Sequence, residues 1–123
     1  MYKLLDYLSI IEASSFVASP TAGLYCAQMG AEVIRVDHKE GGLDYDRYML
    51  TKEGRSLSWE NLNRPKKSVA LDLRSAEGRE LLVELSAATG NLITHFARAE
   101  LPLPRSDCGE ARRPRLVADH GLA

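Results

Sequence analysis

Three pieces of sequence decide the fold: Glu12-Ala-Ser-Ser-Phe-Val-Ala-Ser-Pro20, Gln28-Met-Gly-Ala-Glu-Val-Ile-Arg-Val-Asp37 and Gly41-Gly-Leu-Asp-Tyr-Asp46. They predict, in order, the end of a strand, a tight loop, a helix, a second strand and a glycine-bearing loop. Pro20 suits the first turn of a helix, where its missing N–H costs nothing, and Ser19 before it is the expected N-cap. Gly30 stands where a left-handed residue would end that helix. This order predicts the first half of a nucleotide-binding α/β unit.

The rest of the chain continues the alternation of strands and helices. Strands are predicted at residues 8–12, 33–37, 68–73 and 91–94, with a further strand-like run at 115–118. Helices are predicted at residues 21–29, at 56–62 and after the N-cap Ser75, where the core-facing positions are Leu81, Leu82, Leu85 and Ala88. Strands that alternate with helices over short connections predict an α/β fold, a Rossmann-like parallel sheet with helices on both faces.

The composition is that of an ordinary globular protein. The 123 residues fit one domain, and a formal net charge of −1 gives no electrostatic reason to expect nucleic acid as a partner. No apolar run approaches the roughly 20 residues of a membrane helix, so no membrane contact is expected. Cys26 and Cys108 are too few for a disulfide framework, which favours a cytoplasmic protein with free thiols. The histidines and cysteines lack metal-ligand spacing, so no metal is expected.

The chain changes character after residue 96. The α/β pattern occupies residues 1–96, and residues 97–123 form a divergent tail, rich in proline and arginine, that ends near the last strand-like run. A chain that stops directly after a strand leaves an apolar face without its next layer. The sequence therefore predicts the truncated N-terminal part of a larger two-domain fold, with apolar edges that favour self-association.

The ligand site is expected beyond the carboxyl ends of the parallel strands. The residues there are 14–18, 37–39, 71–74 and 95–98, which combine backbone N–H groups at a helix start with cations and an aromatic ring. Such a set suits an extended, phosphorylated and partly apolar ligand. The first loop has no GxGxxG pattern, so NAD and FAD are not expected, and a small dinucleotide-binding module is the weakest interpretation.

Several single features allow two interpretations each. Asp37, at the end of its strand, could meet a ribose hydroxyl or be a solvated acid. The run Asn63-Arg-Pro-Lys-Lys67 is either a solvated turn or a phosphate contact. Cys26 fits a small buried core residue better than a metal ligand. Trp59 fits a core or interface anchor better than a stacking platform.

Longer motifs occur in a fixed order and spacing across residues 7–96. They are Pro20, Met29-Gly-Ala-Glu-Val-Ile-Arg-Val-Asp37, Gly41-Gly42, Asp46-Arg47, Asn63, Lys66-Lys-Ser-Val-Ala-Leu-Asp-Leu73 and Ala76-Glu-Gly-Arg-Glu-Leu-Leu82. Together they resemble the family III CoA-transferases of the CaiB/BaiF type. Further stretches look most like the 2-methylfumaryl-CoA isomerase branch, which moves CoA between two carboxyl groups of one C5 diacid. They are Phe16-Val-Ala18, Gly41-Gly-Leu-Asp-Tyr45, Ser56-Leu-Ser-Trp59 and Ile93-Thr-His-Phe96.

The resemblance implies a binding site for coenzyme A, which arrives as an acyl-CoA substrate, and a small carboxylic acid as the second partner. The positions that match the family's CoA-lining residues are Phe16, Val17, Ala18, His38, Leu71, Arg74, His95 and Phe96. Family members often carry arginine at the position of His38 and asparagine at that of His95. They also have Pro-Gly where this chain has Ala97-Arg98.

The resemblance also bears on the chemistry. In this family an aspartate carboxylate attacks the acyl-CoA, and covalent intermediates carry the CoA across. The matching position falls beyond Ala123, and Asp119 lies too early to take that role, so no catalytic residue is expected in this chain. The expected function is that of an N-terminal CoA-transferase fragment, inactive alone. The alternative is a non-catalytic remnant that binds CoA or associates with a full-length relative, since intact members are interlocked homodimers.

Overall fold

The computed structural model describes residues 2–95 and the strand at 115–118. Its elements are, in chain order, β1 (Ser9–Ala13), α1 (Ala18–Gln28), β2 (Glu32–His38), α2 (Leu57–Asn63), β3 (Lys67–Leu71), α3 (Ala76–Thr89), β4 (Asn91–Thr94) and β5 (Arg115–Ala118). The predicted alternation of strands and helices is confirmed, and the ends of the elements differ from the prediction by a few residues.

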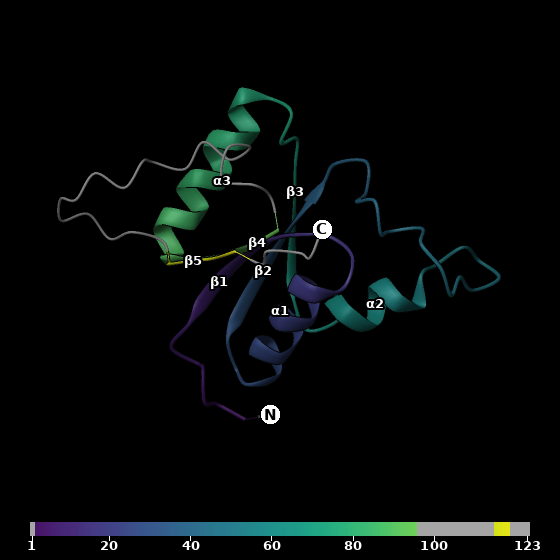
Figure 1. Ribbon diagram of the computed structural model, residues 1–123, viewed down its shortest axis with the longest axis horizontal. Helices are drawn as coiled ribbons and strands as arrows, with labels where there is room; N and C mark the ends of the chain where they lie inside the picture. Colours follow the sequence, from purple (N-terminus) through teal and green to yellow (C-terminus); the bar gives the residue numbers. More distant parts are fainter. Residues whose placement is uncertain (1, 96–114, 119–123) are drawn as a thin grey trace.

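The strands form one parallel sheet in the order β3-β2-β1-β4-β5 (Figure 1). The central strand β1 pairs with β2 on one side, from Ser9↔Glu32 onward, and with β4 on the other, from Ile11↔Leu92 onward. After β3 the chain crosses to β4, on the opposite side of β1. The strand order therefore reverses between β1 and β4, and open α/β sheets bind ligands beyond the carboxyl ends of the strands at such a point.

Helices cover both faces of the sheet, as predicted. Side chains alternate between the faces along each strand, so neighbouring residues of β1 enter different cores. On the α3 face the core consists of Ile11, Ala13, Val36, Leu82 and Leu92. On the α1 face it consists of Ile10, Ala27, Ala31, Val33 and Ile93. Figure 1 shows α1 and α3 on opposite sides of the sheet, and α2 beside α1.

The start of α3 matches the sequence, but part of its predicted core stripe does not. Ser75 caps the helix, since its Oγ accepts a hydrogen bond from the Gly78 N–H at 3.0 Å. Leu82 is fully buried and Leu85 packs against the same core. Leu81 is 41% exposed and Ala88 is exposed as well, so their assignment to the core was wrong. Each residue turns the helix by about 100°, so the predicted stripe is wider than the face that packs on the sheet, and Leu81 and Ala88 fall outside that face.

The start of α1 differs from the prediction. The helix begins at Ala18, its N-cap residue is Val17, and no side chain caps it. The carbonyl of Val17 accepts from both the N–H and the hydroxyl of Thr21, at 2.8 and 2.6 Å, which extends the helix upstream of the expected cap. Ser19 is therefore not the N-cap, and its Oγ is buried without a hydrogen-bond partner. Gly30 is left-handed as predicted, with φ of 105°.

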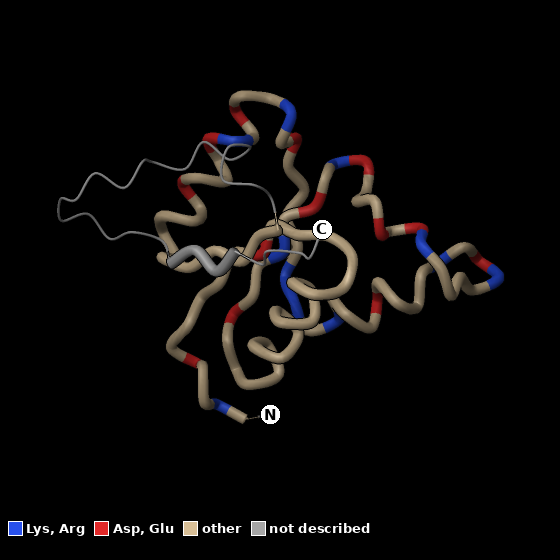
Figure 2. The backbone as a smooth tube through the Cα atoms, in the orientation of Figure 1, with Lys and Arg blue, Asp and Glu red and all other residues tan. Residues whose placement is uncertain are grey.

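No helix within the described ranges is long and apolar enough to cross a membrane. The charged residues lie mostly along the loops and helix ends (Figure 2). A smaller group of both signs lies near the centre of the fold in the same view.

Candidate functional site

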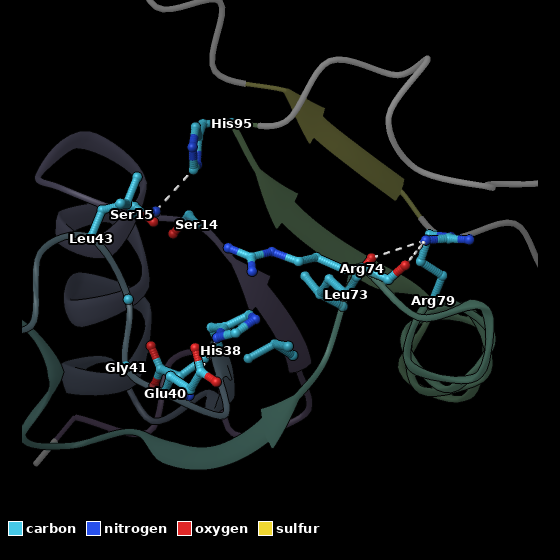
Figure 3. A pocket seen from close by; sticks show the side chains of 13 residues that line it. Ser14, Ser15, His38, Glu40, Gly41, Leu43, Leu73, Arg74, Arg79 and His95 are labelled. Atoms are coloured by element: carbon cyan, nitrogen blue, oxygen red, sulfur yellow. Dashed lines mark hydrogen bonds between the residues drawn. The ribbon is translucent and has the colours of Figure 1, made fainter.

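A cleft of about 610 Å³ opens beyond the carboxyl ends of the strands, where the strand order reverses. It is lined by the last residues of β2, by residues that follow β1, β2, β3 and β4, and by Arg79 of α3, shown in Figure 3. They are Ser14, Ser15, Val36, Asp37, His38, Glu40, Gly41, Gly42, Leu43, Leu73, Arg74, Arg79 and His95. The site expected from the topology is therefore present as a cavity of ligand size.

Arg74 brings a positive charge into this cleft. Its guanidinium points from the end of β3 into the space between Ser14 and His38 (Figure 3). It forms no ion pair with any residue in the described part of the chain. Behind it, the Nη1 of Arg79 donates to the carbonyls of Leu73 and Arg74, at 3.2 and 2.7 Å. Arg79 thus fixes the turn that carries Arg74, and Arg74 is placed to bind an anionic group such as a phosphate.

His38 lies at the end of β2, beside an acid. Its Nδ1 accepts a hydrogen bond from the Glu40 N–H at 3.3 Å, which puts the proton of a neutral ring on Nε2. That Nε2 lies 3.6 Å from Oδ1 of Asp72. The Lys39 ammonium, which donates to Asp72, and the Arg74 N–H together hold the pKa of the Asp72 carboxyl below its usual range. The arrangement presents an imidazole to the cleft beside an acid that stays ionised.

His95 joins the ends of β1 and β4 across the point where the strand order reverses. Its Nδ1 accepts a hydrogen bond from the Ser15 N–H at 3.2 Å, which Figure 3 shows as a dashed line. The imidazole therefore stabilises the loop before α1 as well as lining the cleft.

A second cavity, of about 540 Å³, lies on the other side of this loop. It is lined by Phe16, Val17, Asp44, Arg47, Tyr48, Ser58, Trp59 and Leu62. The Arg47 guanidinium lies 4.8 Å from the centroid of the Phe16 ring, within the range of a cation–π contact. The segment from Ser14 to Val17 thus contributes to both cavities.

The structure brings some of the predicted CoA-lining residues together and separates others. His38, Arg74 and His95 line the first cleft, and Phe16 and Val17 line the second cavity. Leu71 packs against the hydrophobic core at the end of β3, and its neighbour Leu73 lines the cleft instead. Ala18 is exposed at the start of α1 and lines neither cavity. Phe96 lies outside the described residues.

A buried charged network lies beneath the two cavities, and the sequence reasoning missed it. Arg35, 1% exposed, donates from Nε to Asp37 at 2.7 Å and from Nη2 to Asp44 at 3.2 Å. Its Nη1 bonds Glu12 at 3.3 Å and Asn63 at 3.1 Å. Burial lowers the pKa of Arg35, but the hydrogen bond and charge of Asp37, with the other acids, more than offset this and raise it.

The network corrects two interpretations of single residues. Lys66, in the run from Asn63 to Lys67, is buried against Glu12. Its side chain is therefore neither solvated nor placed to contact a phosphate, the two interpretations that the sequence allowed. Both carboxylate oxygens of Asp37 are engaged, by Arg35 at 2.7 Å and by the Ser68 hydroxyl at 3.2 Å. A solvated acid is therefore the wrong description of Asp37. The sequence did contain one signal for this network, because Glu12 and Arg35 carry opposite charges between apolar neighbours within two strands, β1 and β2.

Cys26 and Trp59 have packing roles, as the sequence suggested. Cys26 packs against the α1-face core, and burial, then the charge of Glu12, raises the pKa of its thiol. Trp59 meets Tyr45 edge to face at 5.1 Å and covers Arg35 at 5.8 Å. Within residues 2–95 and 115–118, no group of three histidine, cysteine or acidic side chains could hold a metal ion.

The sequence of the chain matches one family of known proteins. The family model described as CoA-transferase family III matches residues 5–118. A 2-methylfumaryl-CoA isomerase of Chloroflexus aurantiacus is 46% identical over 101 residues, which cover 78% of this chain and 25% of that protein. A cinnamoyl-CoA:phenyllactate CoA-transferase of Clostridium sporogenes is 37% identical over 100 residues, covering 76% of this chain and 24% of that protein.

Solved structures share the fold. A CAIB/BAIF family protein from Brucella suis superposes with a TM-score of 0.67 and 30% identity, over 78% of this chain and 26% of that chain. A hypothetical protein from Mycobacterium tuberculosis gives a TM-score of 0.76 at 26% identity, over 94% of this chain and 32% of that chain. The chain spans about a quarter of the length of the curated relatives it matches.

Proposed function

The chain belongs to CoA-transferase family III, and we propose that it supplies the CoA-binding cleft of an enzyme that moves CoA between carboxylic acids. The observation that carries this proposal is the cleft at the strand-order reversal, with the guanidinium of Arg74, which forms no ion pair among the described residues, pointing into it. Coenzyme A is long, carries phosphates at one end and is largely apolar between its amides. A cavity with two arginines, two imidazoles and apolar side chains in its walls suits such a molecule.

The proposed contacts follow from the positions of the side chains. Arg74 binds a phosphate of the ligand, because a guanidinium matches phosphate oxygens in charge and geometry. His38 and His95 contact the ligand on either side of Arg74, and Leu43 and Leu73 provide apolar contact. Phe16 and Val17, which line the second cavity, are placed to contact the part of the ligand that reaches beyond the loop.

The proposed reaction is transfer of CoA between two carboxyl groups of one C5 diacid. It is supported by the 46% identity to a 2-methylfumaryl-CoA isomerase. An acyl-CoA and a small carboxylic acid are then the ligands, the cytoplasm is the compartment, and a second copy of the chain is the protein partner. We propose that these 123 residues bind CoA without turnover, because the resemblance places the nucleophilic aspartate outside them.

Calorimetric titration of the purified chain with CoA tests the proposal. Arg74→Gln is expected to weaken CoA binding about tenfold or more, the loss of roughly one charge-assisted hydrogen bond. Arg64→Gln is the matched control, because Arg64 is exposed and does not line the cleft. Absence of CoA binding to the unmodified chain at millimolar concentration would refute the function. Equal loss in both variants would refute the role of Arg74.

A second candidate function is association with another protein chain. It is favoured by large apolar side chains that are exposed in one segment, with Leu43 81%, Tyr48 69% and Met49 62% exposed. Clustered exposed apolar groups mark interaction surfaces. Sedimentation velocity distinguishes the candidates, because association shifts the sedimentation coefficient with protein concentration and CoA binding alone does not.

A further inference from the structure

The loop between β1 and α1 is held by a side chain from a distant segment. The backbone N–H of Phe16 donates to Oδ2 of Asp44 at 3.0 Å. Phe16 has φ of 68°, a left-handed conformation that a residue with a Cβ rarely adopts. Such a conformation persists only when the surrounding structure holds it. The carboxylate of Asp44 is a contact that holds it here.

Asp44 is in turn fixed by the buried network. It is 7% exposed, and the Nη2 of Arg35 lies 3.2 and 3.4 Å from its two carboxylate oxygens. Arg35 is anchored through its remaining nitrogens by Asp37 and Glu12. A continuous set of charge-assisted hydrogen bonds therefore runs from the middle of β2, through Asp44, to the backbone of the loop that contributes to both cavities.

This geometry leaves less of the loop before α1 open to an anionic ligand. Backbone N–H groups at and just before the start of a helix attract anions, including the phosphates of nucleotides. Before α1 the N–H of Phe16 is already bound to the Asp44 carboxylate, and the N–H of Ser15 to His95. A phosphate that approached the Phe16 N–H would have to displace a carboxylate that is paired with Arg35. The guanidinium of Arg74, which points into the cleft (Figure 3), has no such competitor among the described residues.

We propose that Asp44 is a positioning residue of the ligand cleft: its carboxylate serves as a built-in anion in the loop before α1. It fixes the Phe16 loop before a ligand arrives and occupies the Phe16 N–H, which leaves the ligand's phosphates to Arg74. The identity of the ligand as CoA rests on the proposed function, whereas the fixing of the loop does not.

The test compares Asp44→Ala with Asp46→Ala, an exposed acid two residues further on. The ¹⁵N-labelled full chain is measured by amide hydrogen exchange at Phe16 and by its dissociation constant for CoA. Asp44→Ala is expected to speed exchange at Phe16 about tenfold or more and to weaken CoA binding by a similar factor. Sodium formate, compared with sodium chloride at equal ionic strength, is expected to reverse both changes, because formate fits the vacated carboxylate position. Asp46→Ala is expected to change neither.

The readouts separate the two proposals. If Asp44→Ala keeps Phe16 protected and binds CoA as the unmodified chain does, the positioning role is refuted and the proposed function stands. If the unmodified chain does not bind CoA, the proposed function fails, and exchange at Phe16 with and without formate still decides the positioning role. If Asp44→Ala does not fold, Asp44→Asn decides by its affinity for CoA, because it keeps an oxygen acceptor for the Phe16 N–H but loses the negative charge toward Arg35. Unchanged affinity in Asp44→Asn would then overturn the role of the carboxylate as a built-in anion.

Discussion

Lys66 places its Nζ 2.8 Å from Oε2 of Glu12, with the two side chains 1% and 0% exposed. The same ammonium donates to the Pro20 carbonyl at 2.8 Å and to Oδ1 of Asn63 at 2.9 Å. One side chain therefore ties the start of β3 to the centre of the sheet, to α1 and to α2. Burial lowers the pKa of Lys66, and the charge of Glu12 opposes that shift.

Lys66→Met is expected to destabilise the fold by about 3–5 kcal/mol, because it leaves Glu12 with one buried oxygen uncompensated. Urea unfolding, followed by the fluorescence of Trp59, the single tryptophan, measures the change. Lys67→Met is the matched control, because the adjacent ammonium is 71% exposed and pairs with Glu32 on the surface. It should cost at most about 1 kcal/mol.

The double variant Glu12→Gln with Lys66→Met tests whether the loss comes from the unpaired charge. It is expected to be more stable than Lys66→Met alone by about 1–3 kcal/mol, since the two residues are coupled. Equal stability of the single and double variants would show that Lys66 acts through packing of its alkyl chain.

Gly23→Ala is expected to disrupt the ion pair between Lys66 and Glu12 from the side of α1. A Cβ at Gly23 would lie 1.8 Å from Oε2 of Glu12 and 3.2 Å from Cε of Lys66, so α1 passes directly over the pair. The expected loss is about 3 kcal/mol or more, measured by urea unfolding. Ala22→Ser adds one heavy atom at an exposed position of the same helix and should change stability by less than about 1 kcal/mol. A stable Gly23→Ala variant would contradict this close approach.

Ser75→Ala and Ser19→Ala should have different effects although both serines stand near helix starts. Ser75→Ala removes the Oγ that accepts the Gly78 N–H and should cost about 1 kcal/mol. Ser19→Ala removes a buried hydroxyl without a partner, so it should be neutral or slightly stabilising. Thermal denaturation of the two variants side by side measures the difference. A larger loss in Ser19→Ala would restore Ser19 as a capping residue.

Lys39→Met should raise the pKa of Asp72 toward its ordinary 3.8, since the Lys39 hydrogen bond is the largest cause of its lowering. A carboxyl whose pKa is lowered by folding stabilises the protein above its ordinary pKa, and this stabilisation is lost as pH falls through the folded-state value. The variant should therefore lose the part of the acid dependence of stability that comes from the Lys39–Asp72 contact, and keep the part that comes from the Arg74 N–H. Carboxyl ¹³C shifts followed against pH report the pKa, with Lys52→Met, an exposed lysine elsewhere, as control. An unchanged titration of Asp72 would contradict the assignment.

Much of the site could be placed from the sequence because its position depends on topology. His38, Arg74 and His95 follow three strands, and parallel strands bring their carboxyl ends to one edge of the sheet. Leu71 ends β3 with its side chain against the core, and Leu73, which packs against the same core, also lines the cleft. Which of the two leucines reaches the cleft depends on the path of the turn after β3, which the strand pattern does not fix.

The sequence by itself determined the order of strands and helices, the cap at Ser75 and the left-handed turn at Gly30. These features rest on periodicity and on the conformational preferences of adjacent residues, which are local properties. Only the tertiary structure decided that Lys66 and Arg35 are buried, that Ser19 caps nothing and that Asp44 holds the Phe16 loop. Each of these depends on residues far apart in the chain that meet only when the parallel strands pair and α1 packs on the sheet. Whether a charge becomes solvated or paired is settled by those contacts and not by its neighbours in sequence.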